Sequence, residues 1–226
     1  MTLIQNLYQT LRFISDASTL TEAQIKVLVP VLSEEIGMRE AERIKRLLLR
    51  SGLKPIKKLE DFDWKFNPKL PREELMQMSE TTWNKEIRNF MLIGPTGVGK
   101  THISKATCYK AILKGIPATC ITCDALIKKI EGTRNKNALL DYYSTVPLLC
   151  IDEIGYVFPK PKEADEIFQI VSRRSELAST IVTTNLIPSM WGKIFEAGTA
   201  TAILDRLSLN GNFLTCPGKS YRTKDK

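Results

Sequence analysis

A glycine-rich run in the middle of the chain has the spacing of a phosphate-binding loop, G-x-x-x-x-G-K-[ST]. The residues are Gly94, Pro95, Thr96, Gly97, Val98, Gly99, Lys100 and Thr101. Glycines here let backbone N–H groups face phosphate oxygens at the N-terminus of a helix, which we expect over 100–113. We predict that this run and the adjoining His102 hold ATP, with Lys100 on the β- and γ-phosphates and the Thr101 hydroxyl on Mg²⁺. His102, the single histidine, is expected to pack there rather than to act as a catalyst.

Two adjacent acids follow a second apolar run, at 148–151. Asp152 is predicted to hold Mg²⁺ through its water shell, and Glu153 to orient and polarise the attacking water. An acidic strand end alone would be weak evidence, but it gains weight after a complete phosphate-binding loop. The pair therefore predicts hydrolysis, and the chain is expected to be an ATPase.

Further catalytic candidates lie towards the C-terminus. Asn185 follows the apolar run 180–183 and can hydrogen-bond the lytic water or the γ-phosphate, although asparagine is also common in turns. Arg206 is the first candidate for an arginine finger that reaches a neighbouring subunit's γ-phosphate. Arg173 and Arg174 form the competing pair, and the alternative for each of these arginines is a surface ion pair.

Short apolar runs alternate with helical segments from residue 89 onward, which is typical of a parallel sheet covered by helices. The candidate strands are 90–93, 118–122, 148–151, 180–183 and 213–216. The strand before the phosphate-binding loop and the strand before the acid pair are separated by enough chain for the 118–122 strand to intervene between them. That spacing favours P-loop ATPases with an additional strand over small-molecule kinases, so we predict an α/β fold.

The first sixty residues have a helical pattern. Thr21 and Gln24 have the spacing of a capping box at a helix start, and Pro30 is expected to stop that helix before Ser33 caps another over 33–50. Gly52 is the predicted C-terminal stop. The proline-containing stretch 54–71 is then the best candidate for a linker. We accordingly expect a helical domain over 1–58, for DNA or a partner, and an ATPase domain over 59–226.

Basic residues are concentrated at the end of that helical region, where seven lie between Arg43 and Lys58 with no acid among them. The chain as a whole carries a net charge of +8, which favours polyanionic partners. A stripe of phosphate contacts on duplex DNA, largely independent of base sequence, would use Arg43, Arg46, Arg50, Lys54 and Lys57. The alternative, equally compatible with the sequence, is a solvated helix face.

Composition and cysteine usage narrow the class of protein. The longest uncharged run, Leu177–Gly192, is too short and too polar to span a bilayer, so no membrane partner is expected. The N-terminus has no secretory signal pattern, and five cysteines in no regular framework favour reduced thiols. Cys120 and Cys123 form an isolated C-x-x-C that we interpret as a strand end rather than a metal site. The cytoplasm is the expected location.

Several motifs together resemble one family. GPTGVGKTH, LLCIDEIGY, STIVTTNL, AILDRL and GKSYR occur in this order in the chain. They resemble the IstB-like ATP-binding proteins of insertion sequences, which are related to the DnaC helicase loaders. The segment 59–64, LEDFDW, is similar to the one that precedes the ATPase in IstB-like proteins.

The resemblance implies an initiator-clade AAA+ core, ATP-dependent self-assembly on DNA and stimulation of a partner transposase. It also implies that Asn185 is the sensor 1 residue. Only ten residues follow Cys216, too few for the usual C-terminal helical lid, so a conventional sensor 2 is not expected. Arg222 remains available to contact nucleotide or DNA.

Two other functions stay open at this stage. A replicative helicase loader would share the fold and use its N-terminal region to bind a helicase. A small-molecule P-loop kinase would need an acceptor pocket and a mobile arginine-rich lid. Glu153 and Asn185 count against the kinase, because both residues serve the activation of water.

Overall fold

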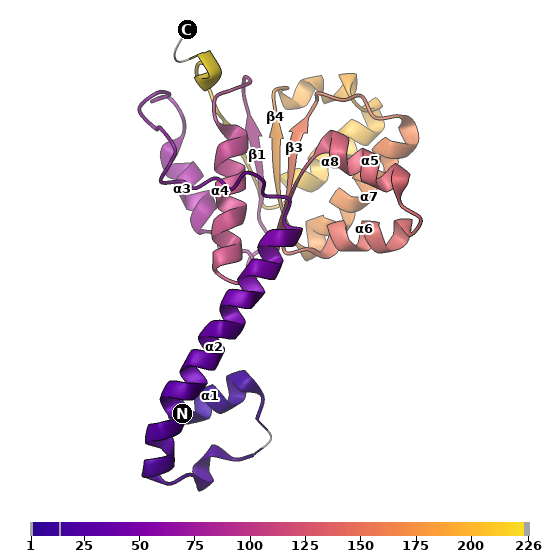
Figure 1. Cartoon of the computed structure of the whole chain (residues 1–226). Coiled ribbons are helices and arrows are strands. Elements are labelled where there is room, and N and C mark those ends of the chain that lie inside the picture. The colour runs from indigo at the N-terminus through magenta and orange to yellow at the C-terminus, as the bar shows by residue number, and fades with distance from the viewer. Residues whose placement is uncertain (1, 14, 224–226) are drawn as a thin grey trace. The chain divides into compact units, whose positions relative to one another are not determined.

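The computed structural model describes residues 2–13 and 15–223. Contacts divide the chain into two compact units, Met1–Leu47 and Leu48–Lys226 (Figure 1). The first unit contains helix α1 (Leu3–Leu11), the short helix η1 (Ala17–Thr19) and most of helix α2 (Glu22–Arg50). Its small core is built on the buried side chains of Ile4, Leu7, Ala17 and Leu32.

Helix α2 begins as predicted but does not stop where predicted. The Thr21 N–H donates to Gln24 Oε1 at 2.9 Å, and the Gln24 N–H donates back to Thr21 Oγ1 at 3.4 Å, which confirms the capping box. The predicted break at Pro30 is wrong, because the helix continues through it. Ser33 caps nothing, and its hydroxyl donates to the Val29 carbonyl at 2.7 Å.

Tertiary packing explains why the helix tolerates this proline. An interior proline costs about 3 kcal/mol. On either side of it, Ile25, Leu28, Leu32 and Ile36 pack into the core of the first unit. Burying several such side chains contributes about 1.5–3 kcal/mol each, enough to offset the proline. Gly52, with φ 72°, lies just past the end of the helix, as predicted.

The proline-containing stretch after α2 is not a loose linker. The Cys120 N–H donates to the Ser51 carbonyl at 2.8 Å, and a Cβ at Gly52 would overlap the Cys120 carbonyl oxygen. Further along the stretch, Leu53, Leu59 and Leu70 are buried. These residues pack with the second unit, so the two units divide after residue 47 rather than after residue 58.

The second unit is built on one parallel sheet of five strands. The strands are β1 (Asn89–Ile93), β2 (Ala118–Thr122), β3 (Leu148–Ile154), β4 (Ser179–Thr184) and β5 (Gly211–Thr215). All five predicted runs are strands, and the predicted α/β class is confirmed. The sheet order is β2-β3-β4-β1-β5. The expectation that 118–122 intervenes between the two motif strands is wrong for the sheet, because β2 lies at an edge and β4 lies between β1 and β3.

Helices cover both faces of this sheet (Figure 1). Helix α4 (Lys100–Leu113) lies on one face, with α3 (Arg72–Glu80) packed on it; α5 (Cys123–Gly132), α7 (Pro161–Leu177) and α8 (Ala197–Ser208) cover the other. Helix α6 (Lys136–Thr145) packs against α7, and η2 (Pro188–Lys193) packs against α8. After β5 the described residues add only the short helix η3 (Tyr221–Thr223).

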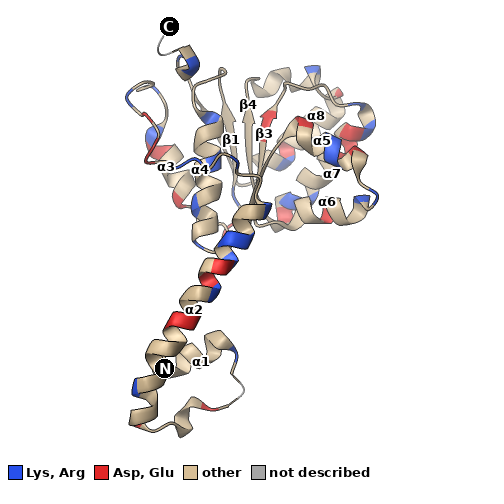
Figure 2. Ribbon diagram, viewed as in Figure 1, with Lys and Arg blue, Asp and Glu red and all other residues tan. Residues whose placement is uncertain are grey.

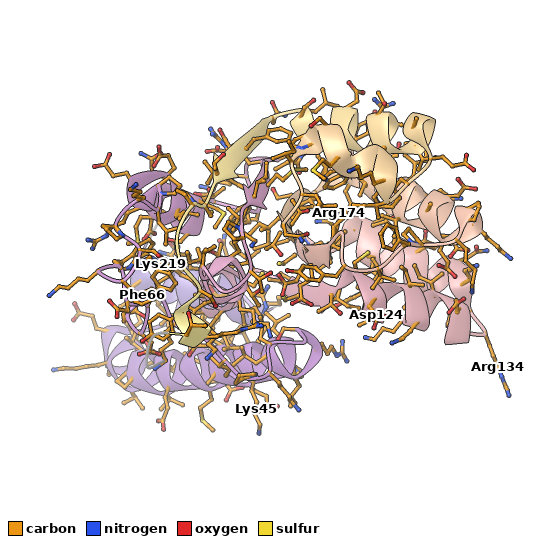
Figure 3. The ribbon with its side chains drawn as sticks, turned by 90° about the horizontal axis from the view of Figure 1, so that it is seen from above. Lys45, Phe66, Asp124, Arg134, Arg174 and Lys219 are labelled. Carbon is orange, nitrogen blue, oxygen red and sulfur yellow. The ribbon has the colours of Figure 1, made fainter. Side chains whose placement is uncertain are left out.

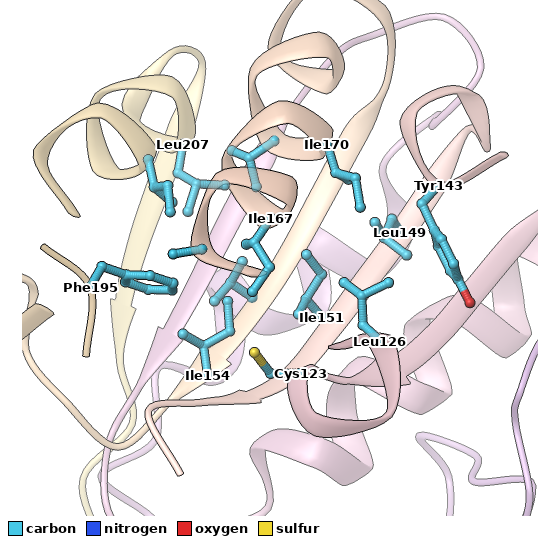
Figure 4. Packing of buried hydrophobic residues seen from close by; sticks show 14 of the residues in the cluster. Cys123, Leu126, Tyr143, Leu149, Ile151, Ile154, Ile167, Ile170, Phe195 and Leu207 are labelled. Carbon is cyan, nitrogen blue, oxygen red and sulfur yellow. The ribbon is translucent and has the colours of Figure 1, made fainter. Parts of the chain in front are cut away.

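The main hydrophobic core lies between the sheet and the second group of helices. Figure 4 shows Leu149 and Ile151 of β3 packed against Leu126 of α5 and Ile167 of α7. Because all five strands are parallel, this core fixes the carboxyl ends of β1, β3 and β4 at one edge of the sheet. Among the residues that the structure describes, no helix is both long and apolar enough to cross a bilayer.

Candidate nucleotide site

The phosphate-binding loop joins β1 to α4, as its sequence predicts. Helix α4 begins at Lys100, directly after Gly99. Gly97 and Gly99 have φ values of 82° and 108°, in the left-handed region that favours glycine. A Cβ at Gly97 would overlap Ser220 Oγ, and one at Gly99 would overlap the Phe62 ring. The loop therefore needs glycine for its backbone conformation and for the segments that press on it.

Lys100 is held at the start of α4 by the loop itself. Its Nζ donates to the carbonyls of Gly94 at 2.6 Å and Pro95 at 2.8 Å. Burial lowers the pKa of Lys100, and the nearby carboxylates of Asp152 and Glu153 act in the opposite direction. A buried ammonium group bonded to neutral carbonyls is well suited to an anionic ligand, because a phosphate supplies the countercharge that the loop lacks.

Asp152 is buried at the end of β3, with 2% of its surface exposed. Its Oδ1 accepts a hydrogen bond from the Thr101 hydroxyl at 3.0 Å and another from the Thr183 hydroxyl. A carboxylate beside a hydroxyl forms the hard oxygen donor set that Mg²⁺ prefers. The residues present thus fit the Mg²⁺ role predicted for Thr101 and Asp152.

Glu153, the next residue, has a very different environment. Its side chain is exposed and lines the cavity beside the loop. Its φ is 62°, an uncommon backbone conformation for a residue other than glycine. The Glu153 N–H donates to Thr183 Oγ1 at 2.9 Å. One acid is therefore buried and bonded, and the other faces the space where a nucleotide would react.

A cavity of about 510 Å³ runs along the loop, a size suited to a nucleotide. The loop lines one part of it, and Ile56, Phe62, Phe66 and Tyr221 give another part an apolar and aromatic wall. Such a wall suits a planar base. Sequence reasoning did not assign these residues, although Phe62 lies in the LEDFDW segment. Arg222 also lines the cavity, which places it where the sequence suggested a nucleotide contact.

Two segments far apart in sequence meet over this cavity. The Asn67 side chain donates to the Lys219 carbonyl and accepts from the Lys219 N–H, both at 2.9 Å. The Tyr221 N–H donates to the Gly97 carbonyl at 2.9 Å, and the Phe66 and Tyr221 rings meet edge to face at 5.0 Å. Figure 3 shows Phe66 and Lys219 lying close together. The segment 216–221 thus braces the loop.

His102 occupies the packing position predicted for it. Its Nε2 lies 2.7 Å from the Lys58 carbonyl, and its ring meets Phe62 edge to face at 5.2 Å. It lines the cavity, as a residue beside the nucleotide should.

Asn185 is exposed, and Arg206 is partly buried. Asn185 lies just past β4 and is not among the described residues that line the cavity, to which β4 contributes Thr183 and Thr184 instead. Arg206 lies on α8, where it forms an ion pair with Asp205 at 2.8 Å. Its side chain is 41% exposed, so the guanidinium remains able to reach a neighbouring chain.

The two competing finger candidates, Arg173 and Arg174, differ in burial. Arg174 is wrong as a finger candidate, because it is fully buried. Its guanidinium donates to Thr180 Oγ1 and to the carbonyls of Tyr143, Val146 and Ser179. Arg173 is exposed and forms an ion pair with Asp141 at 2.7 Å. A buried guanidinium cannot reach another subunit, so Arg174 is a core residue.

The residues predicted to bind DNA occupy different environments. Arg43 and Arg46 on α2 line a hollow of about 540 Å³ in the first unit, together with Arg12, Arg39 and Glu42. Figure 2 shows basic residues along this half of α2, interrupted by acidic ones. In the second unit Arg50 and Lys54 are exposed, whereas Lys57 is half-buried and lines the nucleotide cavity. Lys57 is thus the member of the stripe closest to the ATPase chemistry.

The C-x-x-C pair lies outside the described residues that line this cavity. Cys120 lies in β2 and Cys123 begins α5, so the C-x-x-C lies at a strand end as interpreted. All five cysteines are buried as free thiols. No group of three or more metal-binding side chains occurs within the described part of the chain.

Comparison with known proteins agrees with this geometry. The family model for IstB-like ATP binding protein matches residues 4–226. The chain is 31% identical over 205 residues to an ATP-binding protein of insertion sequence IS232 from Bacillus thuringiensis subsp. berliner, covering 89% of this chain and 82% of that one. It is 34% identical over 203 residues to the ATP-binding protein of IS21 from Pseudomonas aeruginosa, covering 88% and 77%.

Helicase loaders and replication initiators are also similar. The replicative helicase loader DnaC of Buchnera aphidicola is 31% identical over 206 residues, covering 84% of this chain and 81% of that one. The crystal structure of DnaI superimposes with a TM-score of 0.61 at 19% identity, covering 73% and 89% of the two chains. AMPPCP-bound DnaA from Aquifex aeolicus gives a TM-score of 0.58 at 19% identity, covering 72% and 50%.

The two solved structures share the fold, a parallel sheet covered by helices, and the family model with the loop and acid pair establishes a P-loop ATPase that binds ATP. The chain belongs to the IstB-like ATP-binding proteins.

Proposed function

We propose that this chain is an ATP-dependent DNA-binding regulator that self-assembles on DNA and stimulates a partner transposase. The observation that carries the proposal is a complete ATPase site in a chain that has its relatives among insertion-sequence proteins. An ATPase encoded with a mobile element has two evident targets, the DNA and the enzyme that moves it.

Each residue of the site has a distinct role in the proposed reaction. Bound Mg²⁺ would neutralise charge on the β- and γ-phosphates, and Thr101 and Asp152 are the residues that would hold it. Lys100 supplies the countercharge to the phosphates, and Glu153 orients the attacking water. Asn185 is proposed as a further contact to the water or the γ-phosphate once nucleotide and neighbouring subunit are in place.

The N-terminal arginines support the proposed DNA contact. Four guanidinium groups, from Arg12, Arg39, Arg43 and Arg46, surround one hollow in the first unit, with Glu42 as the acid among them. A guanidinium cluster of this kind is suited to phosphate oxygens, which it can contact in pairs. Contact to phosphates alone gives little base specificity, so choice of target would rest on DNA deformability or on the transposase.

The central test is whether ATP controls assembly on DNA. Sedimentation of the chain with a random-sequence duplex is measured with ATP, with ADP and without nucleotide. We expect large complexes with ATP only, and the Glu153→Gln variant should retain them because it binds ATP and hydrolyses it slowly. Equal binding in all three conditions would refute ATP control.

Self-assembly is tested through the proposed trans role of Arg206. Arg206→Ala keeps an intact loop but offers no finger, and Lys100→Ala has a defective site but still presents Arg206. Each variant alone should be nearly inactive, and mixing them should partly restore ATPase activity at interfaces that pair the intact halves. If the variants co-assemble and activity stays absent, Arg206 does not act in trans, and Arg173 becomes the finger to test.

A helicase loader is the second candidate, supported by the similarity to DnaC over most of both chains. The two functions predict different partners for the N-terminal unit. Pull-down with the purified transposase from the same element and with the host replicative helicase separates them. Binding to the helicase alone, with no effect on transposition, would favour the loader.

A further inference from the structure

The Thr183 hydroxyl lies between the two acids of the ATPase site. Thr183 is 1% exposed in β4, and its hydroxyl contacts Asp152 Oδ1 and the Glu153 N–H. The direction of both hydrogen bonds follows from chemistry, since a backbone N–H can only donate and a carboxylate can only accept. Thr183 therefore donates to Asp152 and accepts from Glu153, so one hydroxyl serves both acids.

The backbone of β3 is irregular at this point. Ile151 pairs with Val182 and Ile154 pairs with Thr184, so two residues of β3, Asp152 and Glu153, lie opposite Thr183 alone. This is a β-bulge, a feature that re-aims side chains beside active sites. The extra residue leaves an N–H without its strand partner, and the Thr183 hydroxyl is the acceptor that takes it.

The bulge also explains the backbone of Glu153. A left-handed conformation at a residue other than glycine costs about 1–3 kcal/mol and persists only where its surroundings hold it. Glu153 has φ 62° and places its carboxylate at the cavity, whereas Asp152 beside it stays buried. The bond from the Glu153 N–H to Thr183 is one of the contacts made by this backbone, beside the bond from the Tyr156 N–H to the Glu153 carbonyl at 3.4 Å.

We infer that Thr183 is a positioning residue for ATP hydrolysis, which holds the Asp152 carboxylate and the bulged backbone of Glu153 in register. The inference rests on the proposed role of Glu153 in orienting water. It gives Thr183 a role distinct from that of Asn185, because Thr183 acts through the acids and needs no contact with the nucleotide.

The test compares Thr183→Val, which keeps the shape and removes the hydroxyl, with Thr183→Ser, which keeps the hydroxyl. The Val variant should lower kcat about 30-fold or more while the Kd for ATP changes less than about threefold, and the Ser variant should stay within about threefold of wild type. A Val variant with normal kcat, or a Ser variant as slow as the Val variant, overturns the inference.

A matched control separates positioning from simple core stability. Thr119 is another buried threonine of the same sheet, and its hydroxyl bonds to the Tyr142 hydroxyl at 2.6 Å, away from the ATPase site. Thr119→Val should lower the Tm about as much as Thr183→Val and leave kcat within twofold. An equal loss of kcat in both variants would mean that stability, not position, limits turnover.

A double variant with Glu153 distinguishes the role inferred for Thr183 from the proposed role of Glu153 in orienting water. If Thr183 acts through Glu153 as well as Asp152, adding Thr183→Val to Glu153→Gln should slow turnover by clearly less than Thr183→Val slows the wild-type chain. Fully multiplicative losses would overturn the inference. Wild-type turnover in Glu153→Gln alone would instead refute the role of Glu153, whereas a slow Glu153→Gln beside a normal Thr183→Val would refute only the role of Thr183.

Discussion

The nucleotide cavity and the basic half of α2 both carry charged residues, but they hold them differently. At the cavity, Lys100, Asp152 and the Glu153 backbone each have defined hydrogen-bond partners within the second unit. On α2, the side chains of Arg43, Arg46 and Arg50 are exposed. We expect ATP hydrolysis at the cavity to depend on the position of each catalytic atom, and DNA binding by α2 to depend on the total charge of its arginines.

The difference teaches how each region should respond to change. A group held in a geometric constellation contributes through a transition state or a desolvated contact, so its loss is large and specific. An exposed cation contributes through screened attraction, so its loss is modest and depends on salt. Three variants test whether the two regions follow these different rules, and a fourth, at Arg174, tests a buried guanidinium in the core.

Glu153→Gln should give the largest effect. The amide is nearly the same size but cannot accept a proton from water, so kcat should fall about 1000-fold with ATP affinity little changed. Single-turnover hydrolysis beside a direct ATP titration measures both quantities. Turnover near wild type would assign water activation to another residue.

Lys100→Ala should weaken ATP binding at least about 100-fold, which corresponds to ~2.7 kcal/mol. The phosphates would lose their main countercharge, while the carbonyls of Gly94 and Pro95 that Lys100 now contacts can turn to water. Isothermal titration with ATP gives the affinity. Wild-type affinity in this titration would exclude the loop as the nucleotide site.

Arg174→Leu should destabilise the second unit by about 3 kcal/mol, because it leaves the carbonyls of Tyr143, Val146 and Ser179 without their donor. Arg173→Ala is the matched control, since its exposed pair with Asp141 is worth less than about 1 kcal/mol. Denaturant unfolding compares the two. Equal losses would contradict the assignment of Arg174 to the core.

Reversing the α2 charges should give the smallest change at any single condition. The triple variant Arg43→Glu, Arg46→Glu and Arg50→Glu should weaken DNA binding about tenfold on unrelated sequences. The slope of log K against log salt concentration should become less steep by about 2–3. The control reverses three exposed lysines elsewhere, Lys69, Lys162 and Lys193. If the slope is unchanged, or if the control variant changes it by the same amount, these arginines do not contact DNA phosphates and form a solvated helix face.

Local patterns predicted most of the fold. The second strand was predicted at its observed bounds, 118–122, because its apolar residues lie between a proline turn and a helix cap. Pro30 misled because its local cost is visible in the sequence, whereas the packing of Leu28 and Leu32 against α1 is not. The stretch 54–71 misled for the same reason, since Asn67 is held by Lys219, a partner 152 residues away.

The candidate site also contains residues that the sequence predicts and one residue whose role only the tertiary structure shows. Lys100, Thr101, Asp152 and Glu153 follow from motif spacing, because the chemistry of phosphate and Mg²⁺ dictates those residue types. The sequence places Thr183 at the end of the predicted strand 180–183, but its role depends on a bulge between two strands. A register irregularity of this kind leaves no trace in a single sequence, so its role had to await the structure.

The segment that braces the phosphate-binding loop also sets the order in which the site is completed during synthesis. The Gly97 carbonyl accepts a hydrogen bond from the Tyr221 N–H, and the Asn67 side chain donates one to the Lys219 backbone and accepts one from it. Both partners, Lys219 and Tyr221, are synthesised long after the loop. The edge strand β5, which leads into this segment, is likewise the last strand of the sheet in sequence. A nascent chain without this segment therefore lacks part of its nucleotide site, and tight nucleotide binding requires synthesis to have passed residue 221.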